Sequence, residues 1–386
     1  MRFSNTGLPR LALPLAISLL AGTPAFADAE RLGSDLQALM ADHGELVIGD
    51  LSTSLLGGET TAEDLEFIGQ DGETLSIDRY VVEGDYEQPD AVRLEGIRME
   101  GVDIEDAPQE LEEDLLLSIG GLVLASPGSA VPPQDDDALA EQWFEEVTLT
   151  ELSLKHAGEM LASLAGLELD GDFEDGEGRL LLETLKVDLK RVIALSPEEE
   201  RTQMRMVSNV LTDGTGQLRL DGDFDARWEP EGERDGRLFS DGELTLHDAL
   251  TLAVDLESLL ALPEGADVAE LMADGTLLEE ASLGGGHFVL SVAENGLFSR
   301  LVALGATMEG ISEAEYLEQA RTQAEGFGVM FGPQVTDLLS GLVDLMAGSA
   351  EEVVASFDLP AEEHLESFAD DPLALPDRFS MQVKTR

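Results

Sequence analysis

Alternation of apolar and polar residues constrains the fold of this chain more than any other feature. The clearest stretch covers residues 244–256, where the apolar residues share one parity: Leu244, Leu246, Leu250, Leu252, Val254 and Leu256. Successive side chains of an extended strand point to opposite faces, so this period of two predicts a strand with one apolar face. We therefore expect a protein built largely from half-buried strands.

Short apolar segments with turn signals between them run from residue 45 to residue 125. They are Leu46–Ile48, Leu65–Ile68, Leu75–Val82, Val92–Met99, Val102–Ile104 and Leu115–Leu124. Pairs such as Asp71-Gly72 and Gly84-Asp85 separate them at hairpin spacing. Leucines at helical intervals predict a short helix over residues 30–42 before the first strand. This part of the sequence predicts a helix followed by an antiparallel meander.

The strand pattern continues beyond residue 146 and contains an internal echo. The sequence LELDGDF at 167–173 recurs as LRLDGDF at 218–224, and each copy is followed by Gly-Arg-Leu, which implies repeated architecture. The Asp-Gly pairs in the two copies predict hairpin turns. Between Leu149 and Leu152 the apolar parity flips, which predicts a bulge or a turn there.

Helical periodicity replaces alternation near the C-terminus. Residues 312–315 (SEAE) have the spacing of a capping box, and the helix they begin is expected to reach Gly326. An apolar stripe from Val335 to Met346 predicts a second helix after Pro333. Strands are expected over 353–359 and 379–383 around a short helix at 361–368, and a further helix from 197 to 210.

These patterns predict an α+β fold in which a β-rich antiparallel meander, forming a curved or repetitive sheet, precedes a helical C-terminal region. Ser126–Asp137 combines three prolines with an acidic run and predicts a linker or exposed loop. The expected segments are a signal peptide (1–27), an N-terminal β-rich domain (28–125), the linker (126–138), a second β-rich region with the internal repeat (139–292) and a helical α/β region (293–386).

The first 27 residues have the order of a cleavable signal peptide. Arg2 and Arg10 precede the apolar run 11–22, and Ala25-Phe26-Ala27 stands directly before Asp28. The chain contains no cysteine, which excludes a lipidated N-terminal cysteine, disulfides and thiol catalysis. The longest later apolar stretch, Leu115–Ala125, has the length of a buried strand. We expect a soluble periplasmic protein without an integral membrane segment after cleavage.

The net charge is strongly negative, with 81 acidic residues against 22 basic ones and a formal charge of −59. Salt shortens the Debye length from about 10 Å at 0.1 M to about 3 Å at 1 M, so this self-repulsion is tolerable mainly in a salty compartment. The same field disfavours binding to nucleic acid and to anionic membranes. A solvated surface explains the carboxylates, so single ones carry little functional information.

No motif for nucleophilic catalysis, phosphate binding or zinc binding is present, and we predict no catalytic residue, metal ligand or cofactor. Among the histidines, His43 is expected at a helix end, His247 and His364 at the surface, and His156 as a hydrogen-bonded core residue. His287 follows three glycines that could mark close approach of the backbone to a ligand, although glycine-rich turns into strands are common.

Two acidic clusters offer the oxygen ligands that calcium prefers. They are Asp170, Asp172, Asp175 and Glu177, and Asp221, Asp223 and Asp225. Neither has the glycine and glutamate positions of an EF-hand loop, so hairpin turns are the preferred explanation and calcium is the alternative.

Phrases such as Leu75-Ser76-Ile77-Asp78 and 92–97 (VRLEGI) give residues 45–256 a texture that resembles the periplasmic AsmA-like and related repeating β-groove proteins. The resemblance implies an apolar concave groove and a role in envelope lipid transport or homeostasis. This chain differs from that group in being short and in its expected lack of a retained anchor.

Three functional hypotheses follow from the sequence. The first is a periplasmic protein that binds an apolar ligand such as lipid or acts in envelope maintenance, because repeated one-faced strands need a cover. The second is a structural or protein-interaction module of the envelope without a ligand. The third is an unrecognised carboxylate-dependent hydrolase.

Overall fold

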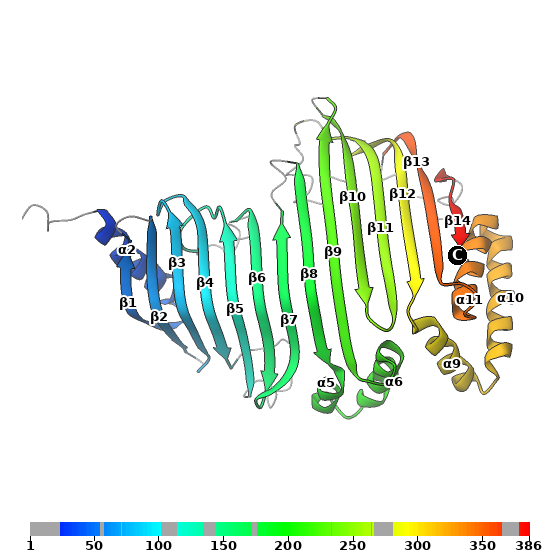
Figure 1. Ribbon diagram of the computed structural model, residues 1–386, viewed down its shortest axis with the longest axis horizontal. Coiled ribbons are helices and arrows are strands. Elements are labelled where there is room, and N and C mark those ends of the chain that lie inside the picture. Colours follow the sequence, from blue (N-terminus) through cyan, green and yellow to red (C-terminus); the bar gives the residue numbers. More distant parts are fainter. Residues whose placement is uncertain are drawn as a thin grey trace, which may run out of the picture. The chain divides into compact units, whose positions relative to one another are not determined.

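The computed structural model describes residues 24–54, 58–70, 72–101, 114–133, 144–171, 176–232, 234–263, 265, 281–364 and 378–386. These residues form fourteen strands and six helices (Figure 1). The chain divides into two compact units, residues 1–145 and 146–386. Each unit is described by itself. Residues 1–23 of the predicted signal peptide (1–27) lie outside the described residues.

The first unit is a five-stranded antiparallel meander preceded by a helix. Its elements are α2 (Pro24–Met40), β1 (Gly44–Thr53), β2 (Glu59–Gly69), β3 (Thr74–Gly84), β4 (Pro89–Glu100) and β5 (Leu115–Ala125). Each strand pairs with the next one in the chain. The predicted opening helix and meander are confirmed, and the segment predicted at 102–104 lies outside the described residues.

Helix α2 covers the apolar face of the first unit at β1 and β2. Its Leu32 and Leu36 are buried, and Gly33 approaches Leu51 so closely that a Cβ would overlap that side chain. The Tyr86 hydroxyl donates a hydrogen bond of 2.8 Å to the Asp35 carboxylate, which attaches α2 to the loop between β3 and β4. The first unit therefore buries the β1–β2 part of its apolar face with its own helix.

The second unit is a nine-stranded antiparallel meander in chain order. Its strands are β6 (Glu146–His156), β7 (Glu159–Asp170), β8 (Glu177–Asp188), β9 (Gln217–Pro230), β10 (Asp235–Leu246), β11 (Leu250–Ala261), β12 (Ser282–Glu294), β13 (Glu352–His364) and β14 (Gln382–Thr385). Its helices are α5 (Leu189–Leu195), α6 (Arg201–Thr212), α9 (Leu297–Glu309), α10 (Glu313–Phe331) and α11 (Pro333–Met346). The C-terminal helices join a sheet that begins at β6.

The parity change predicted between Leu149 and Leu152 is a left-handed residue inside one unbroken strand. Glu151 has a φ of 55°, and Thr184 in β8 has a φ of 50°. The register places both opposite Ala165 of β7. A residue in this conformation changes which parity faces the core, so leucines three positions apart share one face. A register shift between β8 and β9 follows at the same level.

Two strand predictions need correction. The stretch 244–256 is a hairpin rather than one strand, because β10 ends at Leu246 and β11 begins at Leu250, with Leu246 opposite Leu250. An even separation keeps the leucines on one face through the turn, so alternation alone does not reveal it. Asp221-Gly222 lies inside β9 and makes no hairpin turn, whereas Asp170 ends β7. The two copies of the echo thus occupy different places in their strands.

The predicted C-terminal helices are confirmed, and one predicted helix is wrong where it is described. Ser312 and Glu315 form the capping box of α10, which extends beyond Gly326 to Phe331. Residues 361–364 continue β13, with His364 opposite Ser282 of β12, and 365–368 lie outside the described residues. Pairing with β12 overrides the helix preference of this Ala-Glu-Glu sequence.

The helix predicted over 197–210 is α6, which begins four residues later. Helix α5 is an addition that the sequence did not indicate. Its N-terminus is capped by the Asp188 carboxylate, which accepts a hydrogen bond of 3.1 Å from the Arg191 backbone N–H. Among the described residues, no helix combines the length and the hydropathy that a membrane crossing requires.

Candidate functional site

One face of the second unit is apolar across neighbouring strands. We call "the apolar face" the face of β6 to β12 on which these apolar side chains lie. The register places them in continuous rows, for example Leu167, Leu182, Gly222, Leu244, Leu252 and Val292, and beside it Leu169, Leu180, Phe224, Gly242, Val254 and Leu290. Cross-strand neighbours on one face lie about 4.5–5.5 Å apart, so each row is a contiguous apolar surface.

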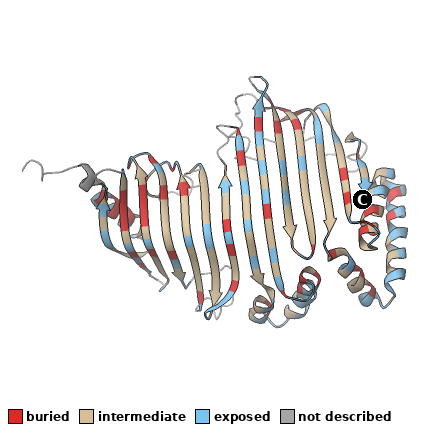
Figure 2. Ribbon diagram, in the orientation of Figure 1, coloured by how far each residue is buried: buried red, intermediate tan, exposed pale blue. Residues whose placement is uncertain are grey.

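Part of the apolar face is only partly buried. Leu169 and Leu180, which pair directly, retain 41% and 40% exposure. Figure 2 shows the same pattern, with intermediate burial along much of the strands of this unit. A soluble protein ordinarily covers a surface of this kind with its own chain or with a partner.

Three clusters of buried residues occupy the borders of this sheet. Trp228 and Leu238 pack with Leu260 and Leu283 near one end of the strands. Val210 of α6 and Leu297 of α9 form a cluster with Ala249, which lies in the turn between β10 and β11. At the C-terminal side, Leu345 of α11 packs against Val353 of β13. The described helices therefore bury one end and one edge of the sheet, and strand residues form the cluster at the other end.

Aromatic rings fill the hollows that glycines leave in the apolar face. A Cβ added to Gly242 would overlap the ring of Phe224, its direct partner in β9. A Cβ on Gly236 would likewise overlap the indole of Trp228. Rings that lie over cross-strand glycines restore the packing that the glycines lack. The result is an apolar surface with little relief at these positions.

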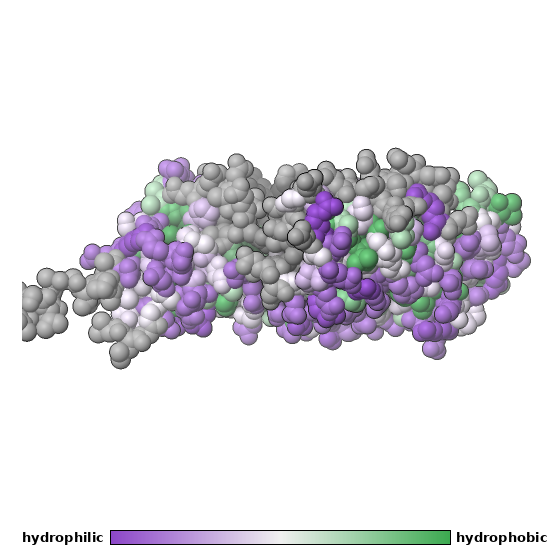
Figure 3. Space-filling view, turned by 90° about the horizontal axis from the view of Figure 1, so that it is seen from above, coloured by the Kyte–Doolittle hydropathy of each residue, from purple (hydrophilic) through white to green (hydrophobic). Residues whose placement is uncertain are grey.

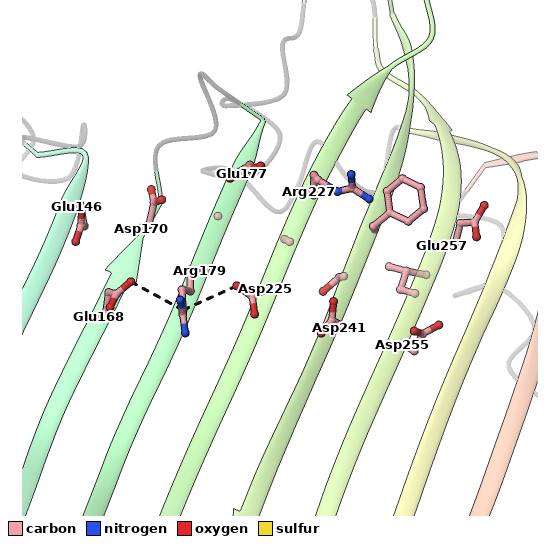
Figure 4. Close-up of a pocket in the computed structure, with 15 residues that line it drawn as sticks. Glu146, Glu168, Asp170, Glu177, Arg179, Asp225, Arg227, Asp241, Asp255 and Glu257 are labelled. Atoms are coloured by element: carbon pink, nitrogen blue, oxygen red, sulfur yellow. Dashed lines mark ion pairs between the residues drawn. The ribbon is translucent and has the colours of Figure 1, made fainter.

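The opposite face is polar and holds a shallow basin of about 490 Å³ (Figure 4). Its charged lining is eight carboxylates and two guanidinium groups: Glu146, Glu168, Asp170, Glu177, Asp225, Asp241, Asp255, Glu257, Arg179 and Arg227. Arg179 lies 3.5 Å from the Asp223 carboxylate and 3.9 Å from those of Glu168 and Asp225. In the part of the chain that the structure describes, no group of histidines and carboxylates is arranged to hold a metal ion. The basin is chemically an acidic surface.

Asp221 is the centre of a polar cluster on this face. Its carboxylate accepts hydrogen bonds of 2.8 Å from both the backbone N–H and the hydroxyl of Thr184, and its other oxygen pairs with the His247 imidazole. The left-handed Thr184 has left the regular ladder at the register shift between β8 and β9. Asp221 thus satisfies a backbone donor that the kink would otherwise leave without a partner.

The same contacts determine the ionisation of Asp221. Partial burial raises the pKa of its carboxyl group, but the hydrogen bonds from Thr184 and His247 lower it more, so the net pKa lies below its ordinary value. A carboxyl whose pKa is lower in the folded chain contributes stability above its unfolded pKa of about 3.9. That contribution is lost as the pH falls through the folded pKa.

Asp221→Asn is therefore expected to lower the free energy of unfolding by about 1 kcal/mol at neutral pH, since it removes charge-assisted hydrogen bonds at a partly exposed site. Once the pH has fallen below the folded pKa of Asp221, the wild-type carboxyl is protonated and the difference should vanish. Denaturant unfolding at several pH values measures this. Asp225→Asn is the matched control on the same strand, and an equal pH-dependent difference in that variant would contradict the role of Asp221.

The histidines are dispersed through the structure. His43 is exposed in the turn after α2, as predicted for a helix end, and His364 is the last residue of β13. His156 is half-buried at the end of β6, and its Nε2 makes no hydrogen bond within the described residues. His247 lies in the turn after β10 and pairs with Asp221, so it is less free than a solvated side chain.

His287 projects from β12 toward Asp358, with 3.4 Å between its Nδ1 and the carboxylate. The glycine before it serves strand pairing, because a Cβ on Gly286 would overlap the Glu257 carbonyl of β11. Gly286 thus allows close approach of β11 and β12.

The acidic clusters considered for calcium are occupied by protein contacts where they are described. Asp221 binds Thr184, and both Asp223 and Asp225 lie near Arg179. Asp172 and Asp175 lie outside the described residues. The hairpin-turn explanation fails at Asp221, whose function is to bind the kinked strand next to it. The kink could have been predicted from Leu182 and Leu185, which are three positions apart. Leu149 and Leu152 have the same spacing around the left-handed Glu151.

No protein-family model matches this chain, and no curated protein sequence matches it. Arguments about function consequently depend on the residues and their geometry.

Proposed function

We propose that this protein is an exported, soluble periplasmic binding protein without catalytic activity, and that it holds an apolar ligand such as a lipid acyl chain on the apolar face of its second unit. The observation that supports the proposal is the contiguous, partly exposed apolar surface across β6 to β11, which includes the pair Leu169 and Leu180. Curvature of this surface into a shallow trough is part of the proposal.

The energetics favour an apolar cover. Each Å² of apolar surface removed from water contributes about 25 cal/mol, and both the leucines and an acyl chain would lose water-exposed surface on contact. Six strands at a spacing of about 4.8 Å span about 24 Å. One acyl chain reaches about half of a hydrocarbon core of about 30 Å. The apolar face is therefore wide enough for an acyl chain lying across its strands.

The sequence supports the cellular side of the proposal. The signal-peptide pattern of residues 1–27 favours export, and the formal charge of −59 favours a salty compartment that shares ions with the surroundings. The textural resemblance to AsmA-like β-groove proteins of the envelope favours a lipid over other apolar ligands. We accordingly place the function in envelope lipid binding or maintenance.

A pair of adjacent substitutions tests the proposal. Replacing both Leu169 and Leu180 by glutamine is expected to weaken uptake of a fluorescent fatty acid about tenfold, because polar amides would then meet the acyl chain. Both leucines are already about two-fifths exposed, so the fold should tolerate the change. Fluorescence titration of the full chain in about 1 M salt, where the Debye length is about 3 Å, measures the uptake.

Leu181→Gln is the matched control, since Leu181 follows Leu180 on the same strand and lies opposite Glu168 on the polar face. This variant should take up the probe as the wild type does. Absence of uptake by the wild-type chain, together with a clean ligand-free mass after gentle purification, would contradict the proposal. A stable protein partner captured by crosslinking in cells would then favour an interaction module, and turnover abolished by one carboxylate substitution would favour a hydrolase.

A further inference from the structure

The C-terminal end of α10 carries an apolar surface that is separate from the apolar face of the sheet. Val329 is 90% exposed, Met330 73% and Phe327 49%. We call these three side chains "the α10 tip". Helix α10 ends at Phe331 and α11 begins at Pro333, so the tip lies at a hairpin between two helices. Figure 3 shows apolar surface gathered on the side of the second unit where these helices lie.

The helical hairpin holds the tip in a defined conformation. A Cβ on Gly328 would overlap the Thr336 hydroxyl, so α10 and α11 approach closely just behind the exposed residues. The rings of Phe327 and Phe331 stack with their centroids 6.0 Å apart. Gly332, with a φ of 100°, makes the turn, and its N–H donates a 2.9 Å hydrogen bond to the Gly328 carbonyl. The exposure therefore belongs to a folded helix end.

Charge is absent from this segment. Residues 326–336 contain no charged side chain, whereas 27% of the chain is charged and the net charge is −59. Glu325 and Asp337 flank the segment on either side. A segment that enters the hydrocarbon boundary of a bilayer must exclude charges, since each costs several kcal/mol to bury there. Solubility alone would favour the opposite arrangement at so exposed a position.

We propose that the α10 tip inserts into the surface of a neutral, zwitterionic lipid bilayer. A convex group of Phe, Val and Met side chains needs no preformed pocket in a fluid lipid phase, in contrast to a protein partner. The acidic surface repels anionic lipid, which selects a neutral headgroup layer. The acidic surface also opposes contact between two copies of this chain. A different protein that recognised so acidic a surface would use basic side chains, and the tip has no acidic group to pair with them.

This interaction goes beyond the proposed ligand site and depends on different residues. A bilayer contact would let a lipid-binding protein meet its source of lipid, but insertion of the tip requires no ligand on the sheet. The two proposals can therefore fail separately. Absence of membrane binding together with normal fatty-acid uptake would contradict only the proposal for the α10 tip. Absence of uptake together with normal membrane binding would contradict only the proposal for the apolar face.

The test is flotation of the full chain with phosphatidylcholine vesicles in about 1 M salt. The wild-type chain should float with the vesicles. The double substitution Val329→Ser/Met330→Ser should lower its partition coefficient about tenfold or more, because the largest exposed apolar area is removed. Met308→Ser is the matched control, since Met308 is similarly exposed on α9 outside the hairpin. That variant should bind as the wild type does.

Four results would overturn the proposal. They are failure of the wild-type chain to float, equal loss in the Met308 variant, unchanged flotation of the tip variant, and stronger binding when phosphatidylglycerol replaces phosphatidylcholine. Sedimentation without vesicles adds an independent check. A dimer that the tip substitutions dissociate would show that the tip is an interface between copies and would likewise overturn membrane insertion.

Discussion

Leu32→Ala is expected to destabilise the first unit by about 2–5 kcal/mol, the usual cost of removing a buried leucine side chain. Leu32 is fully buried between α2 and the sheet. The truncation leaves a cavity at the contact that attaches the helix to β1 and β2. Amides of β1 and β2 should therefore exchange with solvent hydrogen faster, by a factor that corresponds to this free energy.

Local exchange is the appropriate measurement, because a chain with two compact units need not unfold in a single step. Ser34→Ala is the control on the exposed side of the same helix and should leave the exchange rates within a few-fold of the wild type. Equal rates in the Leu32 and Ser34 variants would contradict the view that α2 covers the apolar face of this unit.

Gly242→Val should cost the second unit about 2–3 kcal/mol, although valine is among the best strand formers. The new side chain would occupy the position of the Phe224 ring and force the ring to move. Denaturant unfolding followed through the fluorescence of Trp228, which lies four residues after Phe224 in β9, measures the loss of unfolding free energy.

The physical reason can be isolated with a double-mutant cycle. In a Phe224→Ala background the ring is absent, so Gly242→Val should be close to neutral or slightly stabilising. The expected coupling between the two positions is about 2 kcal/mol, which is large for a pair of side chains in contact. Additive effects would show that the glycine is required for a reason other than the ring.

Local signals in the sequence predicted the meander, the opening helix and the capped C-terminal helices, because each depends on residues close together in the chain. The capping box at Ser312 is one example, in which two neighbouring side chains bond each other's backbone. Predictions failed where strand pairing opposes a local preference. Asp221-Gly222 has the composition of a turn, but both residues pair with β10 and Gly222 also pairs with β8, which keeps the segment extended within β9.

The sequence predicted that the strands have an apolar face, but not which residues meet on it or how much of it stays exposed. Alternation predicted strands with one apolar face, and the parity flip at Leu149 and Leu152 correctly indicated an irregularity. Which leucines lie opposite each other depends on register, and how much of the face remains exposed depends on where the helices pack. Neither α5 nor the position of α11 against β13 has a signature in the alternating pattern.

Rings lying over glycines have a consequence for how a ligand would behave on the apolar face. With Phe224 filling the hollow at Gly242 and Trp228 that at Gly236, no side-chain notch there matches a particular branch or double bond. An acyl chain on such a surface would gain affinity from its length and would translate across the strands with only small barriers. The protein would then select its ligand by physical state and would accept any fluid hydrocarbon chain rather than one defined molecule. Bound and free ligand would exchange rapidly.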